Sequence, residues 1–226
     1  MKHIALLTTL LLSASLQAVE KPYDYVFFEN SLMKGDYFYS QAKYTSPSWI
    51  KNARHHLPVA GSVAFTPGNS LELTYVSAPG GDWYSEIQYC PVRGNDFFRE
   101  PSTLSMQVQL RESMNAAALP NIAIRYADST YTQYLNLRNY LKDTRPGVWH
   151  SVSIPLKDFG LNAVNDTNIK KLAAVALRPG TADGNEYTIY LDDIELLPAS
   201  LPSVSALNAP VLQEAKAYER HIDICL

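Results

Sequence analysis

The sequence predicts an all-β protein whose main domain is a two-layer antiparallel β-sandwich. Short runs rich in β-branched and aromatic residues recur along the chain, and residues that favour turns separate them. The chain also contains 14 prolines and 10 glycines, which argue against long helices. Together these observations favour a single sandwich over residues 23–197.

The expected strands follow one another at intervals that suit such a sandwich. Leu104, Met106, Val108 and Leu110 alternate with polar residues, which is typical of a strand with one buried face. Only Ser113–Leu119 and Asp166–Leu172 carry a helical signal, of a turn or two. The expected strands are Tyr25–Glu29, Tyr37–Ser40, Leu71–Val76, Trp83–Tyr89, Thr103–Leu110, Ile122–Tyr126, Tyr131–Leu137, Trp149–Ile154, Leu172–Arg178 and Tyr187–Leu196.

Both ends of the chain differ from the sandwich in composition. Residues 1–18 have a charged start, a short apolar core and small residues at the exit, which indicates a signal peptide and a secreted protein, periplasmic or extracellular. Residues 198–210 contain three prolines and little charge, as expected of a linker. Residues 211–226 resemble the start of a second β domain of the fibronectin type III kind. We therefore expect either that this tail pairs with the sandwich or that the chain is the front part of a longer protein with a downstream catalytic domain.

Charge and cysteine content narrow the possible partners. The net charge is -3, with no basic excess of the kind that nucleic-acid binding requires. No later apolar run approaches the roughly 20 residues that cross a bilayer, so no membrane association is expected. The two cysteines, Cys90 and Cys225, lie far apart, and a disulfide between them is not expected.

The last expected strand contains two adjacent acids in an apolar run. Ile189 and Leu191 share one parity, whereas Ile194 and Leu196 share the other, so a regular strand would place the two pairs on opposite faces. An extra residue at Asp192 and Asp193 would form a bulge and keep all four apolar side chains inside.

This strand and the segment from Trp149 to Phe159 resemble the last strands of the galactose-binding-like jelly rolls that serve as carbohydrate-binding modules, with family eleven the nearest. The shared features are a tryptophan, an Ile-Pro-Leu strand with a phenylalanine nearby, and a Tyr-hydrophobe-Asp-Asp-Ile strand. The resemblance implies a jelly-roll sandwich, often with a structural Ca²⁺ and a sugar-binding face. Such modules occur at the amino end of secreted glycoside hydrolases.

The resemblance also suggests where a calcium ion would bind. First and last strands lie side by side in such domains, which makes Glu29, Asp192 and Asp193 candidate ligands. Carboxylate oxygens are the hard ligands that calcium prefers. The alternative is a surface acid pair hydrogen-bonded to loop amides.

A sugar-binding surface needs aromatic faces flanked by polar groups that pair with hydroxyls. If Ile87, Leu135 and Leu177 point inward, alternation turns Tyr84, Tyr134 and Arg178 outward. Arg125, Gln107 and Gln109 on neighbouring strands would join them, unless the two sheets divide the set. Trp83 follows a flexible loop and is expected to cap the surface. The candidate carbohydrate-binding residues are Trp83, Tyr84, Arg125, Tyr134 and Arg178.

The pattern predicts a secreted, non-catalytic module that binds a polysaccharide such as a β-glucan for a degrading system. Two alternatives stay open: a structural domain that orients a downstream catalytic domain without binding sugar, and a glycoside hydrolase. The second is disfavoured because no acid in the sequence resembles a known glycoside hydrolase motif, and no nucleophile elbow, zinc-binding helix or phosphate loop occurs either.

Overall fold

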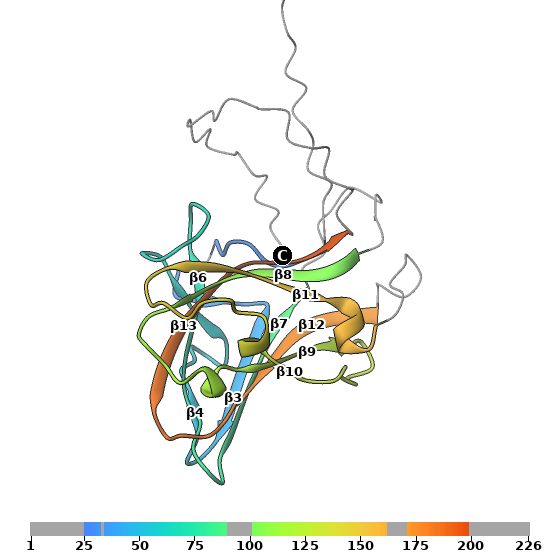
Figure 1. The fold of residues 1–226 in the computed structure, drawn as a ribbon. Helices are drawn as coiled ribbons and strands as arrows, with labels where there is room; N and C mark the ends of the chain where they lie inside the picture. The colour runs from blue at the N-terminus through green and yellow to red at the C-terminus, as the bar shows by residue number, and fades with distance from the viewer. Residues whose placement is uncertain (1–24, 33, 90–100, 162–170, 199–226) are drawn as a thin grey trace, which may run out of the picture.

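Two antiparallel sheets form a sandwich in the computed structural model, which describes residues 25–32, 34–89, 101–161 and 171–198. Figure 1 shows β8 and β11 of one sheet lying over β9 and β12 of the other. The predicted fold class is confirmed. Three 3-10 helices lie wholly within the described ranges: η1 (Ala116–Ala118), η2 (Leu137–Asn139) and η3 (Leu156–Phe159).

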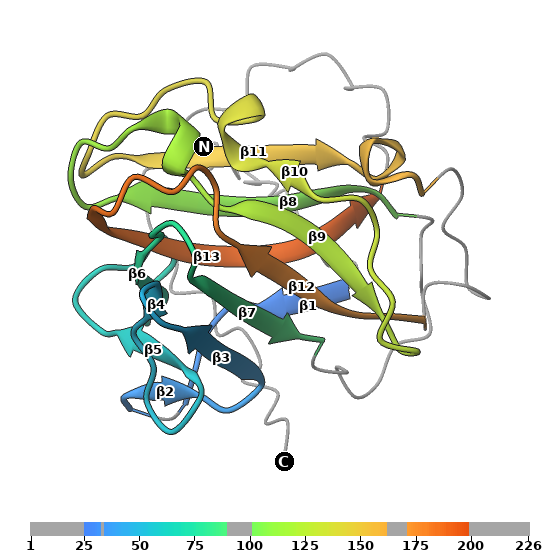
Figure 2. The ribbon, with the colours of Figure 1, turned by 90° about the horizontal axis from the view of Figure 1, so that it is seen from below.

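The eight-stranded sheet has the order β11-β8-β13-β6-β5-β2, with β1 paired to β13 and β4 paired to β6. Its short strands β2, β4 and β5 group at one side of the molecule, away from β8 and β11 (Figure 2). The strands are β1 (Tyr25–Phe28), β2 (Asp36–Tyr37), β4 (Trp49–Ile50), β5 (Leu57–Ala60), β6 (Ser70–Val76), β8 (Pro101–Leu110), β11 (Trp149–Pro155) and β13 (Glu186–Pro198).

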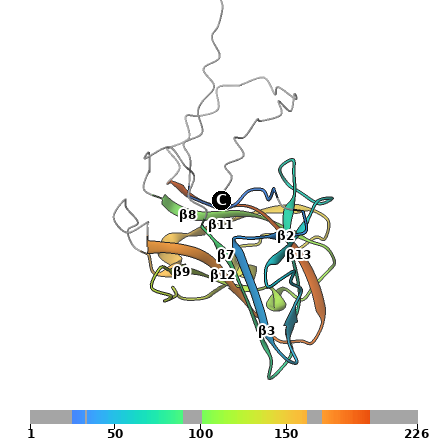
Figure 3. The same cartoon turned by 180° about the vertical axis from the view of Figure 1, so that it is seen from behind.

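The five-stranded sheet has the order β10-β9-β12-β7-β3. Seen from behind in Figure 3, β3, β7, β12 and β9 follow one another across it. The strands are β3 (Ser40–Thr45), β7 (Asp82–Gln88), β9 (Asn121–Tyr126), β10 (Leu135–Asn136) and β12 (Leu172–Arg178). The sequence did not predict β4 and β5. Of β3, it predicted only the first residue, Ser40.

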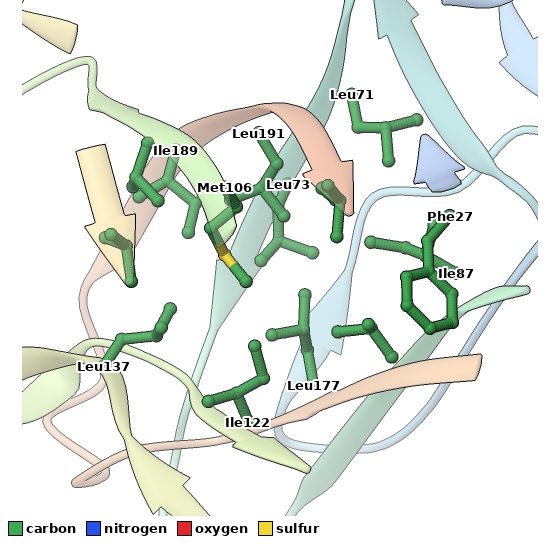
Figure 4. Packing of buried hydrophobic residues seen from close by; sticks show 14 of the residues in the cluster. Phe27, Leu71, Leu73, Ile87, Met106, Ile122, Leu137, Leu177, Ile189 and Leu191 are labelled. Carbon is green, nitrogen blue, oxygen red and sulfur yellow. The ribbon is translucent and has the colours of Figure 1, made fainter. Parts of the chain in front are cut away.

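The core fills the space between the sheets. Figure 4 shows Met106, Ile189 and Leu191 of the eight-stranded sheet facing Ile122 and Leu177 of the five-stranded sheet. All five are at most 1% exposed. Each such side chain stabilises the fold by about 1.5–3 kcal/mol relative to its exposed state. The inner faces of both sheets are therefore committed to packing, which leaves the outer faces for other roles.

The predicted bulge in β13 is confirmed. Asp192 pairs with Gln107 and Glu195 pairs with Ser105, so β13 carries one residue more than β8 over this stretch. Asp193 absorbs the extra residue with φ 46, a left-handed conformation that aspartate tolerates better than most residues. Ile189, Leu191, Ile194 and Leu196 are all 0–1% exposed as a result.

Several predictions fall outside the described residues. They concern the signal peptide, most of the linker, the C-terminal segment, Cys90, Cys225 and most of the second helical turn. In the described part of the chain, none of the helices has the length and apolar character needed to cross a membrane.

Candidate functional site

The outer face of the five-stranded sheet collects most of the predicted site residues. Along β7, Trp83 and Ile87 point into the core, whereas the alternate residues Tyr84 and Glu86 point outward. Glu86 pairs with Ala176 on β12, which in turn pairs with Ala123 on β9. These pairings align the outward side chains of the three central strands in rows across the sheet.

Small side chains form the floor of this face. Ala123, Ala174 and Ala176 all point outward by register, yet they are only 0%, 0% and 2% exposed. Larger side chains must therefore lie over them. Alanine at these positions leaves room for aromatic rings to lie across the sheet.

Tyr131 and Tyr134 supply rings on this face. Their centroids are 6.0 Å apart with an interplanar angle of 28°, and the residues stay 38% and 36% exposed. Tyr131 forms a bridge with Arg125 on β9, and its hydroxyl donates to Oε1 of Glu86 on β7 over 2.7 Å. The side chains of Tyr131 and Glu86 must therefore span β12, which lies between β9 and β7. We call the two rings of Tyr131 and Tyr134 the tyrosine platform.

Two arginines neutralise the acids of this face. Nε of Arg125 lies 3.1 Å from Oε1 of Glu86, and both side chains are largely buried. Nη1 of Arg178 lies 3.4 Å from Oδ2 of Asp82 in an exposed pair, and its guanidinium carbon lies 5.7 Å from the ring centroid of Tyr134. Each of these two carboxylates is thus matched by a guanidinium, which leaves the centre of the face with little net charge.

The platform tyrosines stay neutral over the physiological pH range. Burial, and then the hydrogen bond with Glu86, raises the pKa of Tyr131 to about 12. Burial also raises the pKa of Tyr134, although Arg178 opposes this shift. Both hydroxyls therefore keep their protons, and Tyr131 donates its proton to Glu86.

Tyr84 borders the opposite side of the face. Its hydroxyl donates to Oε1 of Gln41 over 3.4 Å, and Nζ of Lys43 lies 5.8 Å from its ring centroid. Gln41 and Lys43 pair with Glu86 and Tyr84, so all four belong to one outward surface.

The structure brings four of the five predicted residues to this one surface: Tyr84, Arg125, Tyr134 and Arg178. Trp83 is a correction, because it is 1% exposed in the core and its Nε1 donates to Oγ of Ser77 over 3.0 Å. Gln107 and Gln109 lie on β8 of the other sheet and cannot join the set. Sequence reasoning missed Tyr131, whose link to Glu86 crosses strands that are far apart in the chain.

A polar depression adjoins the platform. Its volume is about 350 Å³, and no acidic residue belongs to its lining. We call it the amide depression; its lining residues are Ala117, Asn121, Asn136, Arg138, Asn139, Gly180 and Thr181. Asn121 pairs with Arg178 and with Asn136, which places the depression at the β10 side of the same outer face.

The acid pair of the β13 bulge forms a second polar site. Asp192 is 0% exposed, and its Oδ2 accepts from the backbone N–H groups of Phe65 and Thr66 over 2.8 and 3.2 Å. Its Oδ1 accepts from the N–H of Asp193 over 2.8 Å. Burial, with the neighbouring charge of Asp193, raises the pKa of Asp192 to about 7 against these bonds.

The structure meets only part of what a calcium site at the candidate ligands would require. β1 and β13 are neighbours as predicted, with Phe28 opposite Ile194, and this places Glu29 and Asp193 near the same crossing. Carboxylates suit calcium, but the described ranges contain no group of three or more His, Cys, Asp or Glu side chains that could hold a metal. The three backbone bonds to Asp192 also match the alternative of acids bound to loop amides. Calcium binding by Glu29, Asp192 and Asp193 stays a prediction.

Comparison with known proteins shows which family this fold matches. The family model described as carbohydrate binding domain 30 matches residues 24–197. The predicted resemblance to a carbohydrate-binding jelly roll is confirmed, and the family that matches is thirty where the sequence suggested eleven. A solved family 30 carbohydrate-binding module is 17% identical with a TM-score of 0.56, covering 83% of this chain and 94% of its own. That likeness concerns the fold alone.

Two similar proteins come from Parabacteroides distasonis. An exo beta-1,2-glucooligosaccharide sophorohydrolase (non-reducing end) is 99% identical over 224 residues, which are 99% of this chain and 31% of that protein. The crystal structure of a beta-1,2-glucanase is 98% identical with a TM-score of 0.79, covering 86% of this chain and 28% of that one. The chain therefore spans less than a third of either relative.

Proposed function

We propose, because this chain belongs to the carbohydrate binding domain 30 family, that it binds a neutral β-glucan on the outer face of its five-stranded sheet. The observation that carries the proposal is the tyrosine platform, whose two stacked rings stay more than a third exposed above an alanine floor. An aromatic ring that lies open to solvent on a sheet offers the flat apolar surface on which the apolar face of a pyranose packs.

The polar groups around the platform fit a neutral ligand. Arg125 and Arg178 can donate hydrogen bonds to sugar hydroxyls, while Asp82 and the hydroxyl oxygen of Tyr84 can accept them. Asp82 and Glu86 are each paired with an arginine within 3.4 Å, so the centre of the face carries no unpaired acid, and the further charges of Lys43 and Arg138 lie at its edges. Orientation of the sugar would come from these pairs and affinity from the rings.

The linkage that we propose is β-1,2. One Parabacteroides relative is named for hydrolysis of beta-1,2-glucooligosaccharides and the other is a beta-1,2-glucanase. A module within such a hydrolase would hold the same polymer for the catalytic part. We further propose that residues 1–18 export the protein, since a polymeric glucan is met outside the cytoplasm.

Isothermal titration of the purified chain with linear β-1,2-glucan, alongside β-1,3- and β-1,4-linked glucans, tests this proposal. Tyr134→Ala is expected to weaken binding by about 10- to 100-fold, as truncation of an aromatic anchor commonly does. Tyr44→Ala is the matched control, because Tyr44 is 55% exposed on β3 with the parity of the core-facing residues. No heat of binding with any glucan at millimolar concentration would refute the proposal.

A second candidate is a structural domain that orients the catalytic part of a longer hydrolase. It is supported by the short share of each Parabacteroides relative that this chain spans. In that case Tyr134→Ala in the full-length hydrolase would leave glucan retention unchanged, whereas removal of the whole domain would lower stability or activity.

A further inference from the structure

The amide depression lies one step along the sheet from the tyrosine platform. Tyr134 and Asn136 are two residues apart and share one parity, which separates them by roughly 7 Å. Asn136 opposes Asn121, and Asn121 opposes Arg178, the arginine over the Tyr134 ring. A sugar chain that leaves Tyr134 in this direction therefore enters the depression with its next ring.

Hydrogen bonds fix the floor of the depression. Nδ2 of Asn136 donates to the carbonyl of Leu119 and to Oδ1 of Asn121, both over 3.0 Å. Nδ2 of Asn121 donates in turn to the carbonyl of Pro179 over 2.6 Å. These bonds hold both amides in place, so the floor is preorganised and would lose little side-chain entropy on binding.

The wall of the depression requires a glycine. A Cβ on Gly180 would lie 2.2 Å from the carbonyl oxygen of Leu119, so no side chain fits between the two loops. The next residue, Thr181, donates its N–H to the carbonyl of Ala117 over 2.8 Å. The close approach holds Thr181 at the rim.

The rim offers groups that suit hydroxyls. Arg138, Asn139 and Thr181 are exposed, and their side chains make no described hydrogen bond or ion pair. A guanidinium, an amide and a hydroxyl can together donate and accept toward the vicinal hydroxyls of a hexose. With no acid in the lining, nothing attracts a cation.

We propose that the amide depression binds the hexopyranose ring that follows the ring stacked on Tyr134, with Arg138, Asn139 and Thr181 bonded to its hydroxyls. This inference rests on the proposed function, because it needs a glucan chain on the platform. It makes affinity depend on the length of the oligosaccharide.

Isothermal titration with glucose and with linear β-1,2-gluco-oligosaccharides of increasing length tests the inference. Wild-type affinity is expected to rise when the ring that reaches the depression is added. The double variant Arg138→Ala with Asn139→Ala should lose that rise, about three- to tenfold, and keep wild-type affinity for glucose, which occupies the platform alone. Thr181→Val, which keeps the shape of the rim, should lose part of this rise in affinity with length.

The control is Arg111→Ala, which removes an exposed arginine at the end of β8 in the other sheet. Thermal melting of each variant confirms folding. Binding that rises with length in the double variant as in the wild type would overturn the inference and leave the proposed function intact. Failure of the wild type to bind any length, or unchanged binding by Tyr134→Ala, would overturn the proposed function and the inference with it.

Discussion

The hydroxyl of Tyr131 donates to Oε1 of Glu86 over 2.7 Å, and the same oxygen lies 3.1 Å from Nε of Arg125. One carboxylate oxygen thus joins a tyrosine beside β9 and an arginine on β9 to a glutamate on β7. The link ties the Tyr131 ring, by its hydroxyl, to the far side of β12, which lies between β9 and β7. Ring orientation therefore depends on a hydrogen bond at its far end.

Tyr131→Phe tests this dependence, because it keeps the ring and removes only the hydrogen bond. We expect the free energy of unfolding to fall by about 1 kcal/mol and glucan affinity to fall by about fivefold, since the ring becomes free to tilt. Urea unfolding and isothermal titration measure the two effects. Tyr37→Phe, which removes a hydrogen bond to the carbonyl of Phe27 in the eight-stranded sheet, is the control and should leave affinity unchanged.

Trp83 and Tyr134 should separate stability from binding. Trp83 lies in the core against Tyr75, with centroids 4.8 Å apart, so Trp83→Ala is expected to cost about 3–5 kcal/mol of unfolding free energy. Tyr134→Ala should cost less than about 1 kcal/mol and remove most of the affinity. Denaturation curves and titrations of both variants check this. Loss of affinity in a folded Trp83→Phe variant would contradict the assignment of Trp83 to the core alone.

Local alternation along strands predicted much of this face. Tyr84 and Arg178 were placed correctly because period two is a property of each strand by itself. The same rule would have placed Trp83 inside, since Trp83 and Ile87 share a parity, but the flexible loop before Trp83 suggested exposure. That error was avoidable from the sequence.

Other features needed the three-dimensional arrangement. Alternation showed that Gln107 and Gln109 lie on a solvent-facing side of their strand. It could not show to which of the two sheets that strand, β8, belongs. The contact between Tyr131 and Glu86 joins residues 45 positions apart through the order of three strands. The short strands β4 and β5 carry too few residues for a periodic signal.

Asp192 should make stability depend on pH. Its pKa is raised from 3.8 to about 7 in the folded chain, so the folded state keeps a proton that the unfolded state releases near pH 4. The stabilising contribution is complete below pH 4 and is lost as the pH rises through 7, at up to about 1.4 kcal/mol per pH unit. Urea unfolding at pH 5 and pH 8 should show wild type losing stability relative to Asp192→Asn.

The control for this experiment is Asp128→Asn. Asp128 is exposed, and its hydrogen bonds with Thr130 lower its pKa, so it does not titrate between pH 5 and pH 8. The difference between this variant and the wild type should stay constant over that range. A constant difference for Asp192→Asn as well would mean that the three backbone N–H donors keep Asp192 ionised despite its burial.

Removal of metal tests the predicted calcium ion between β1 and β13. An ion held by Glu29 and Asp193 would bind the folded chain alone, so it would stabilise that state by mass action. We expect the melting temperature to fall on addition of EDTA and to recover with CaCl₂ but not with MgCl₂, because calcium accepts irregular oxygen ligands and magnesium does not. Asp193→Asn should abolish the response. A melting temperature that EDTA leaves unchanged would exclude the ion and leave the backbone bonds of Asp192 as the reason for the acid pair.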